Sequence, residues 1–197
     1  LYDTEIREEK TDDYRDFSNA SSLLLRLELE GVDVGDRWSE LADLAESRSG
    51  DGCLVFADLH YMLALAGDNR PDAAARLTAN VATTAQGSAD QAYVMKDPGV
   101  AAAEGLAAFG DGQYDLAVSK LRAAQPKVQI MGGSHAQRDV FERVTIDAGL
   151  RAGRLDETAA LVAERTALRN GAVDAFTDAR MKMIARARAL KPTVAAE

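Results

Sequence analysis

The sequence predicts an all-α protein, an array of about nine to ten helices that repeats a helix–turn–helix unit. The composition supports this fold class, because 47% of the residues are hydrophobic but only 6% are aromatic. Helices rich in alanine and leucine can approach one another closely. Apolar residues recur at helical spacing between glycine-containing breaks. One corner sequence also returns at an interval typical of helical solenoids.

Helix boundaries are visible in the first quarter of the chain. The first amphipathic segment has Ser18 or Asn19 as its candidate N-cap and ends at Gly31. A second helix is predicted to run from Asp36 to a glycine-serine break at residues 49–52. Two helices separated by a short loop are therefore expected before residue 53.

The next segment, residues 53–69, is apolar almost all round, which indicates a helix packed between neighbours. The run exceeds ~10 residues, which favours a helix over a strand. Trp38, in the preceding helix, is predicted to anchor two helices to each other.

The opening stretch, "LYDTEIREEK", has the character of a helix interior. We therefore expect residues 1–197 to form one helical-repeat domain that is the C-terminal part of a longer protein.

A corner sequence recurs three times. Pro71, Tyr114 and Leu155 occupy matching positions, 43 and then 41 residues apart. Gly-Asp precedes the first two positions, and the third copy keeps the glycine, the Asp and the small residues. Each corner is predicted to be a turn between two antiparallel helices. Helical solenoids have periods of about 34 to 47 residues, which includes this spacing.

The middle corner has the sharpest pattern. Its spacing resembles a tetratricopeptide repeat, in which small residues let two helices approach and larger residues fill the space between them. We therefore predict a tetratricopeptide-like α-α superhelix. The residues that carry this pattern are Gly105, Gly112, Tyr114, Ala117, Leu121 and Ala124.

Charge, cysteine content and motifs exclude several function classes. The formal net charge is −9, and an acidic chain repels phosphate backbones, so no nucleic-acid partner is expected. Cys53 is the single cysteine, which excludes an internal disulfide or a cysteine-based zinc site and fits a reducing, cytoplasmic location. No apolar run reaches the ~18 residues of a membrane span, and no phosphate loop, HExxH, Gly-x-Ser-x-Gly or EF-hand motif occurs. We expect no membrane contact, metal or cofactor.

The stretch "GGSHAQRDVFERVTIDAGL" predicts a well-capped helix from His135 to about Ala152. Ser134 and Gln137 have the spacing of a capping box, in which each side chain bonds the backbone of the other. Helical geometry gives this helix one packing face. The residues of that face are Val140, Phe141, Val144, Thr145 and Ala148.

The opposite face of this helix carries His135, Arg138, Asp139 and Glu142. The first helix of each pair in a solenoid lines the concave surface, so these side chains are candidates to bind a peptide or small ligand, together with the capping residues. Two alternatives stay open. The face could be solvated or internally paired, with Arg138 and Glu142 at i,i+4 spacing. A catalytic role is the other alternative.

His60 is the only other histidine, and it shares an apolar helical face. Such a histidine is usually a hydrogen-bonded core residue. The alternative is that His60 and Asp58 join the groove, where two histidines with Asp58 or Asp139 could bind a metal. The spacing of these residues gives no ligand signal for a metal.

The last helix is predicted to pack as a cap through one apolar stripe, with homodimerisation through the same stripe as the alternative. Basic residues gather at residues 179–191, where cations complement the dipole at a helix C-terminus. The stripe consists of Phe176, Ala179, Met183, Ala187 and Leu190.

Three segments together resemble the C-terminal half of the tetratricopeptide repeat protein 38 family: "NASSLLLRLELEGVDVGDRW", "FADLHYMLALAG" and "GGSHAQRDVFERVTIDAGLRAGR". The resemblance runs through nearly the whole chain and is weakest after Arg169. It implies an all-α repeat fold, a soluble cytoplasmic protein and no established catalytic activity. Family members have an upstream helical half with a His- and Trp-containing motif. The family motif positions, without an assigned role, are Asp58, His60, Ser134, His135, Gln137, Arg138 and Asp139.

The sequence therefore predicts a helical-repeat interaction module that binds a protein segment or small ligand on its concave face. Two other functions remain open. The chain could be part of a hydrolytic or metal-assisted enzyme whose site is completed by an N-terminal half. It could also be a structural module that dimerises.

Overall fold

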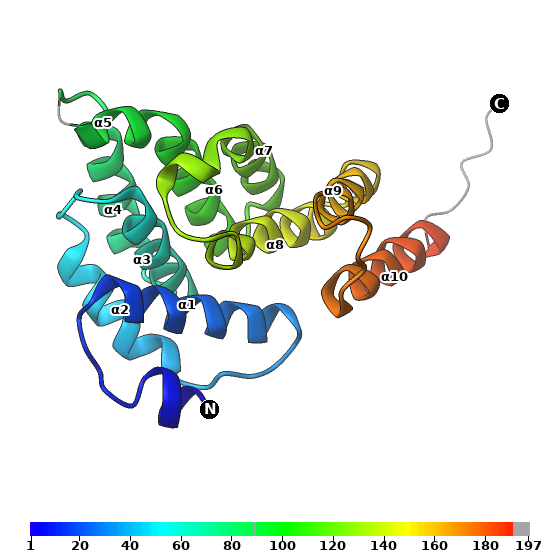
Figure 1. Cartoon of the computed structure of the whole chain (residues 1–197), viewed down its shortest axis with the longest axis horizontal. Coiled ribbons are helices and arrows are strands. Elements are labelled where there is room, and N and C mark those ends of the chain that lie inside the picture. The colour runs from blue at the N-terminus through cyan, green and yellow to red at the C-terminus, as the bar shows by residue number, and fades with distance from the viewer. Residues whose placement is uncertain (89, 191–197) are drawn as a thin grey trace.

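The computed structural model describes residues 1–88 and 90–190, and every regular element among them is helical (Figure 1). The predicted all-α class and the number of helices are confirmed for these residues. Short π-helical or 3-10 segments are η1 (Tyr2–Ile6), η2 (Met95–Gly99) and η3 (Gln125–Met131). The α-helices are α1 (Tyr14–Leu29), α2 (Arg37–Arg48), α3 (Val55–Gly67), α4 (Pro71–Thr84), α5 (Asp90–Val94), α6 (Val100–Gly110), α7 (Tyr114–Ala124), α8 (His135–Arg151), α9 (Leu155–Leu168) and α10 (Ala175–Leu190).

The helices form two rows. Helices α3, α6 and α8 pack against the helices that follow their corners, α4, α7 and α9. Helix α1 packs against α3, α3 against α6, and α6 against α8. Because α1 also packs against α8, this inner row of helices closes on itself (Figure 1).

The three repeated corners share one backbone conformation. Asn69, Gly112 and Gly153 have left-handed φ values of 53°, 72° and 72°, which is the usual way to terminate a helix. The next residue in each corner donates its N–H to a carbonyl five residues earlier. These bonds are Arg70 to Leu65 (2.8 Å), Gln113 to Ala108 (2.8 Å) and Arg154 to Gly149 (3.0 Å). The helix–turn–helix corners predicted from the sequence are therefore confirmed.

The start of α1 differs from the prediction. Asp13 is the N-cap and its side chain accepts the N–H of Arg15, so Ser18 and Asn19 were wrong as candidate caps. Ser18 is buried inside α1, where its hydroxyl donates to the carbonyl of Tyr14 at 2.6 Å. A buried serine satisfied by its own helix does not need to be a cap. Gly31, with a φ of 81°, ends the helix region as predicted.

The opening stretch is not a continuous helix, so that expectation was wrong. Only η1 is helical, and residues 7–13 run without a helix to α1. The buried Arg7 donates to Glu40 of α2 at 2.6 Å and to the carbonyl of Thr11 at 2.7 Å. These contacts hold the segment against α2, and the charged side chain is satisfied by tertiary partners.

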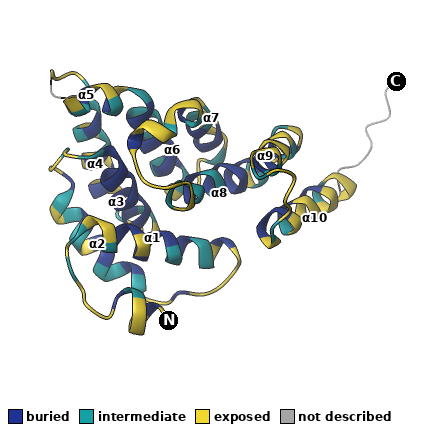
Figure 2. Ribbon diagram, in the orientation of Figure 1, coloured by how far each residue is buried: buried dark blue, intermediate teal, exposed yellow. Residues whose placement is uncertain are grey.

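Helix α3 occupies the centre of the fold, as its apolar sequence predicts. Every residue from Val55 to Leu65 is buried (Figure 2). Trp38 of α2 is buried as well and lies directly against Gly67 at the end of α3. The predicted role of Trp38 as an anchor between two helices is therefore confirmed.

The buried face of α10 has a different register from the predicted stripe. Phe176, Arg180 and Ile184 are buried, whereas Met183 is exposed and Leu190 is 83% exposed. The Phe176 ring lies 4.4 Å from the guanidinium carbon of Arg143 and 4.2 Å from that of Arg180. Stacking on these guanidinium groups decides the register, because it pairs an aromatic ring with desolvated cations.

Arg180 connects the last helix to the first. Its side chain is 2% exposed and donates to Asp147 of α8 (3.1 Å), to Glu30 (2.9 Å) and to the carbonyl of Leu29 (2.5 Å). Burial raises the pKa of Asp147, and Arg180 partly offsets that shift. Leu29 and Glu30 form the C-terminal end of α1, where a cation complements the helix dipole. This contact therefore holds α1, α8 and α10 together.

Gly67→Ala is expected to destabilise the fold. A Cβ at residue 67 would lie 2.5 Å from ring atoms of Trp38, so the substitution should lower the free energy of unfolding by about 1–3 kcal/mol. Gly50→Ala is the matched control, because a Cβ there meets no heavy atom within 4 Å. Urea unfolding of both variants measures the difference, and equal effects would contradict the close packing of α2 on α3.

Candidate functional site

A cleft of about 690 Å³ lies where η3 and α8 meet the end of α9. Its apolar floor comes from the buried side chains of Leu121, Ala124, Met131 and Phe141. Leu168, an exposed leucine of α9, also lines it. The polar lining residues are Gln125, Gln129, His135, Arg138, Asp139, Glu142, Arg143, Thr145, Arg165, Arg169 and Asp174.

The structure brings four of the predicted site residues to this cleft. His135, Arg138, Asp139 and Glu142 all line it from the first two turns of α8. Ser134 and Gln137 do not line it and instead cap α8. The Ser134 N–H donates to Gln137 Oε1 at 2.8 Å, and the Gln137 N–H donates to Ser134 Oγ at 3.3 Å. The predicted capping box is confirmed, and it fixes where α8 begins.

The two glycines before α8 are required by geometry. Gly132 and Gly133 have left-handed φ values of 92° and 72°, a conformation that favours glycine. A Cβ at Gly133 would also lie 2.5 Å from the ring of Phe56. The glycines therefore let the chain turn against α3 and enter α8 at the edge of the cleft.

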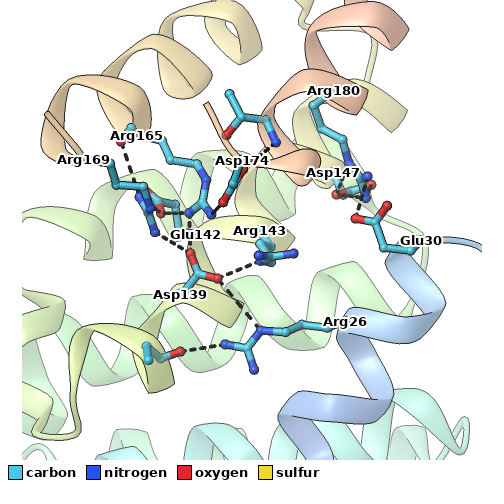
Figure 3. A network of polar contacts seen from close by, with 12 residues as sticks. Arg26, Glu30, Asp139, Glu142, Arg143, Asp147, Arg165, Arg169, Asp174 and Arg180 are labelled. Atoms are coloured by element: carbon cyan, nitrogen blue, oxygen red, sulfur yellow. Dashed lines mark hydrogen bonds and ion pairs between the residues drawn. The ribbon is translucent and has the colours of Figure 1, made fainter. Parts of the chain in front are cut away.

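Asp139 is the centre of an ion-pair network (Figure 3). It accepts hydrogen bonds from Arg143 of its own helix at 2.7 Å, from Arg169 at 2.6 Å and from Arg165. Arg26 of α1 approaches the same carboxylate to 3.9 Å and donates to the carbonyl of Ala136 at 2.7 Å. One carboxylate thus connects α8 with α1 and α9.

Glu142 and Asp174 complete the network. Glu142 accepts from Arg165 and from Arg169 (3.2 Å), and Asp174 accepts from Arg165 at 2.8 Å. The alternative pair of Arg138 with Glu142, predicted from i,i+4 spacing, is not formed, because Glu142 points to arginines of the next helix.

Burial explains why Arg165 needs so many partners. Its side chain is 1% exposed, and a buried charge is costly unless it is paired and hydrogen-bonded. Burial alone would raise the pKa of Asp139, but hydrogen bonds from Arg165 and Arg143 outweigh it and hold that pKa below its usual value. Asp139 is therefore ionised at neutral pH and is held by donors from α8 and α9.

Arg138 differs from the other arginines of the cleft. Its Nη1 donates to the carbonyl of Gly132 at 3.0 Å and to the carbonyl of Gly133. It forms no ion pair with any carboxylate in the described part of the chain. Arg138 is therefore a positioned cation at the edge of the cleft, with no anionic partner among the described residues.

His60 and Asp58 lie in the core instead of the cleft. His60 is buried, and its Nδ1 lies 2.7 Å from the carbonyl of Phe56, which identifies Nδ1 as the donor. Its ring packs against Phe141 with centroids 5.1 Å apart. Burial lowers the pKa of His60 to about 4. The core interpretation of His60 is confirmed, and a shared groove with His135 is not formed because neighbours cover α3 on all sides.

Asp58 is a buried carboxyl group without a hydrogen-bond partner on Oδ2 among the described residues. Burial raises its pKa to about 7, with a smaller contribution from Asp51. A neutral acid is thus the favoured form of Asp58 in the folded protein below that pH.

The arginines of α9 were not among the site residues predicted from the sequence. Arg165 and Arg169 are four residues apart and reach the cleft from the second helix of the last pair. Their i,i+4 spacing places them on one helical face, which is the only signal in the sequence that they act together. Their partners Asp139 and Glu142 are 23 to 30 residues away, whereas Asp174 is nine residues from Arg165.

Across residues 1–88 and 90–190, no three or more His, Cys, Asp or Glu side chains are placed to hold a metal ion. None of the helices in this part of the chain combines the length and the hydropathy that crossing a bilayer requires.

No protein-family model matches the sequence, and no solved structure gives a significant match to the chain.

Asp58→Asn is expected to change how stability depends on pH. Folding raises the Asp58 pKa from 3.8 to about 7, so its ionisation costs the folded state stability as pH rises through this interval. The free energy of unfolding of the variant minus that of the wild type should increase by on the order of 2–3 kcal/mol between pH 5 and pH 8. Other titrating groups, including His60, are common to both proteins and cancel in this difference. Urea unfolding at both pH values measures it, and a difference independent of pH would contradict the raised pKa.

Proposed function

We propose that this chain is a tetratricopeptide-like helical-repeat module that binds a protein segment or small ligand in the cleft beside α8. One observation carries the proposal: His135, Arg138, Asp139 and Glu142 line the same cleft as an apolar floor. Ligand sites typically combine an apolar cavity of about 300–1,000 Å³ with a few placed polar groups. The ion-pair network supports rigid placement of those groups, which favours recognition.

The repeat identity within this proposal is supported by the corners and by close helix packing. A Cβ at Gly105 of α6 would lie 2.7 Å from the side chain of Leu121 on α7, which agrees with the expected role of a small residue opposite a large one. Membership of the tetratricopeptide repeat protein 38 family is likewise proposed, on the quoted segments. A cytoplasmic location is part of the same proposal and is supported by the free thiol of Cys53.

The proposed site is narrower than the concave face expected from the sequence. Helix α1 packs against α3 and α8, and Arg26 of α1 bonds the backbone of Ala136. These contacts cover one side of α8. The ligand would therefore bind on the other side of the helix, between η3 and α9.

Dimerisation is a second candidate function, supported by the exposed side of α10. Met181, Met183 and Leu190 are exposed there, and apolar side chains at the end of a repeat array are common contact points. A homodimer would use this end of the molecule and leave the cleft open.

Ala136→Trp is expected to block the cleft. Ala136 is exposed and lines the cleft, so an indole there should fill the space while changing the free energy of unfolding by less than about 1 kcal/mol. We expect the wild type to enhance the fluorescence of Nile red, a neutral apolar dye, and Ala136→Trp to abolish that enhancement. Ala185→Trp, at an exposed position of α10, is the matched control and should retain the enhancement. Equal dye binding by both variants would contradict a ligand site in the cleft.

A further inference from the structure

We infer that the cleft takes a small apolar carboxylic acid, whose carboxylate binds Arg138 and whose hydrocarbon part covers the apolar floor. This inference rests on the proposed function and specifies its ligand.

The described side chains of the cleft carry an excess of positive charge. The lining contains four arginines and three carboxylates. All three carboxylates are bonded by the other arginines, so that Arg138 has no carboxylate partner in the described chain. Arg26 adds a further positive charge behind Asp139. The chain as a whole carries a net charge of −9, which disfavours anion binding elsewhere on its surface. The local excess of positive charge therefore favours binding of an anion in the cleft.

The guanidinium of Arg138 is oriented for two-point recognition. Its Nη1 is held by the carbonyls of Gly132 and Gly133. Its Nε–H and Nη2–H donate to no residue within 1–88 and 90–190. These two parallel donors form the fork that matches the two oxygens of a carboxylate. Because the glycine carbonyls already fix the side chain, binding costs little side-chain entropy.

Carboxylate fits this position better than phosphate. The lining has four arginines and three carboxylates, an excess of one positive charge, so the second negative charge of a phosphate monoester would not be balanced by the lining. A cationic ligand would instead face the four arginines of the lining. A single negative charge balances Arg138, which has no carboxylate partner among residues 1–88 and 90–190.

The remainder of the cleft selects an apolar body. Leu121, Met131 and Phe141 form a buried floor, and the volume of about 690 Å³ accommodates a medium-length hydrocarbon chain. Burial of each methylene group contributes favourably to binding. An acid without an apolar part would therefore bind more weakly than a medium-chain acid.

Isothermal titration with octanoate tests this inference on the full chain. Octan-1-ol, octylamine and octyl phosphate are the chemical controls, and we expect the wild type to bind octanoate more tightly than any of them. Arg138→Gln should weaken octanoate binding on the order of tenfold to a hundredfold, because charged hydrogen bonds are lost. Arg138→Lys should also weaken it, because an ammonium has charge but no fork. Arg186→Gln removes the same charge from the exposed side of α10 and should change affinity by less than about twofold, because distant exposed charges are screened.

The possible results distinguish a wrong ligand class from a wrong binding site. If octan-1-ol or octyl phosphate binds as tightly as octanoate and Ala136→Trp abolishes that binding, the cleft is a binding site but the carboxylate inference is wrong. If octanoate binds equally to the wild type, Arg138→Gln and Arg138→Lys, the role of Arg138 is wrong. If Ala136→Trp leaves octanoate binding unchanged, the cleft is not the site and the proposed function fails with it. Absence of octanoate binding to the wild type contradicts the carboxylic-acid class, while Nile red binding tests the cleft independently.

Discussion

The contact of Arg180 with the end of α1 joins the two extremes of the helical array. Its guanidinium is buried and donates to the carbonyl of Leu29, to Glu30 and to Asp147. A buried cation without these partners would cost several kcal/mol, roughly 3–5 when one partner of a buried pair is lost. The folded state therefore favours the arrangement in which α1 lies against α8 and the inner row of helices is closed.

The cleft is a consequence of that closure. With α1 on one side of α8, Arg26 reaches Asp139 and the backbone of Ala136. On the other side, Arg165 and Arg169 bond the same carboxylate from α9. Asp139 is thus fixed between two helices that are far apart in the sequence. Arg138, one residue earlier, lines the cleft and has no carboxylate partner in the part of the chain that the structure describes.

Local signals predicted much of the fold because they act over a few residues. The capping box of α8 and the three corners depend on contacts within one turn or one loop. The apolar run of α3 was readable because a helix covered by neighbours on all sides is apolar on all its faces. A local pattern gave a wrong prediction where it was compatible with two structures. Ser18 has the chemistry of a cap, but inside a helix it bonds Tyr14 instead.

The partners in the site could not be predicted from local patterns. The polar face of α8 was identifiable, but most donors to Asp139 and Glu142 lie on α9. Arg180 likewise bonds Glu30 across 150 residues. Periodicity also placed Met183 in the packed stripe of α10, because hydropathy alone ranks methionine above arginine. The structure buries Arg180 instead, because Asp147 and the end of α1 satisfy its charge.

Hydrogen exchange of α1 in Arg180→Gln, relative to the wild type, tests most directly whether Arg180 holds α1 against α8. Exchange of the buried Leu24 and Leu25 amides should accelerate by about tenfold or more relative to amides of α3, because α1 would open without global unfolding. Parallel acceleration of α1 and α3, or no change in either, would contradict the claim that Arg180 holds the array closed.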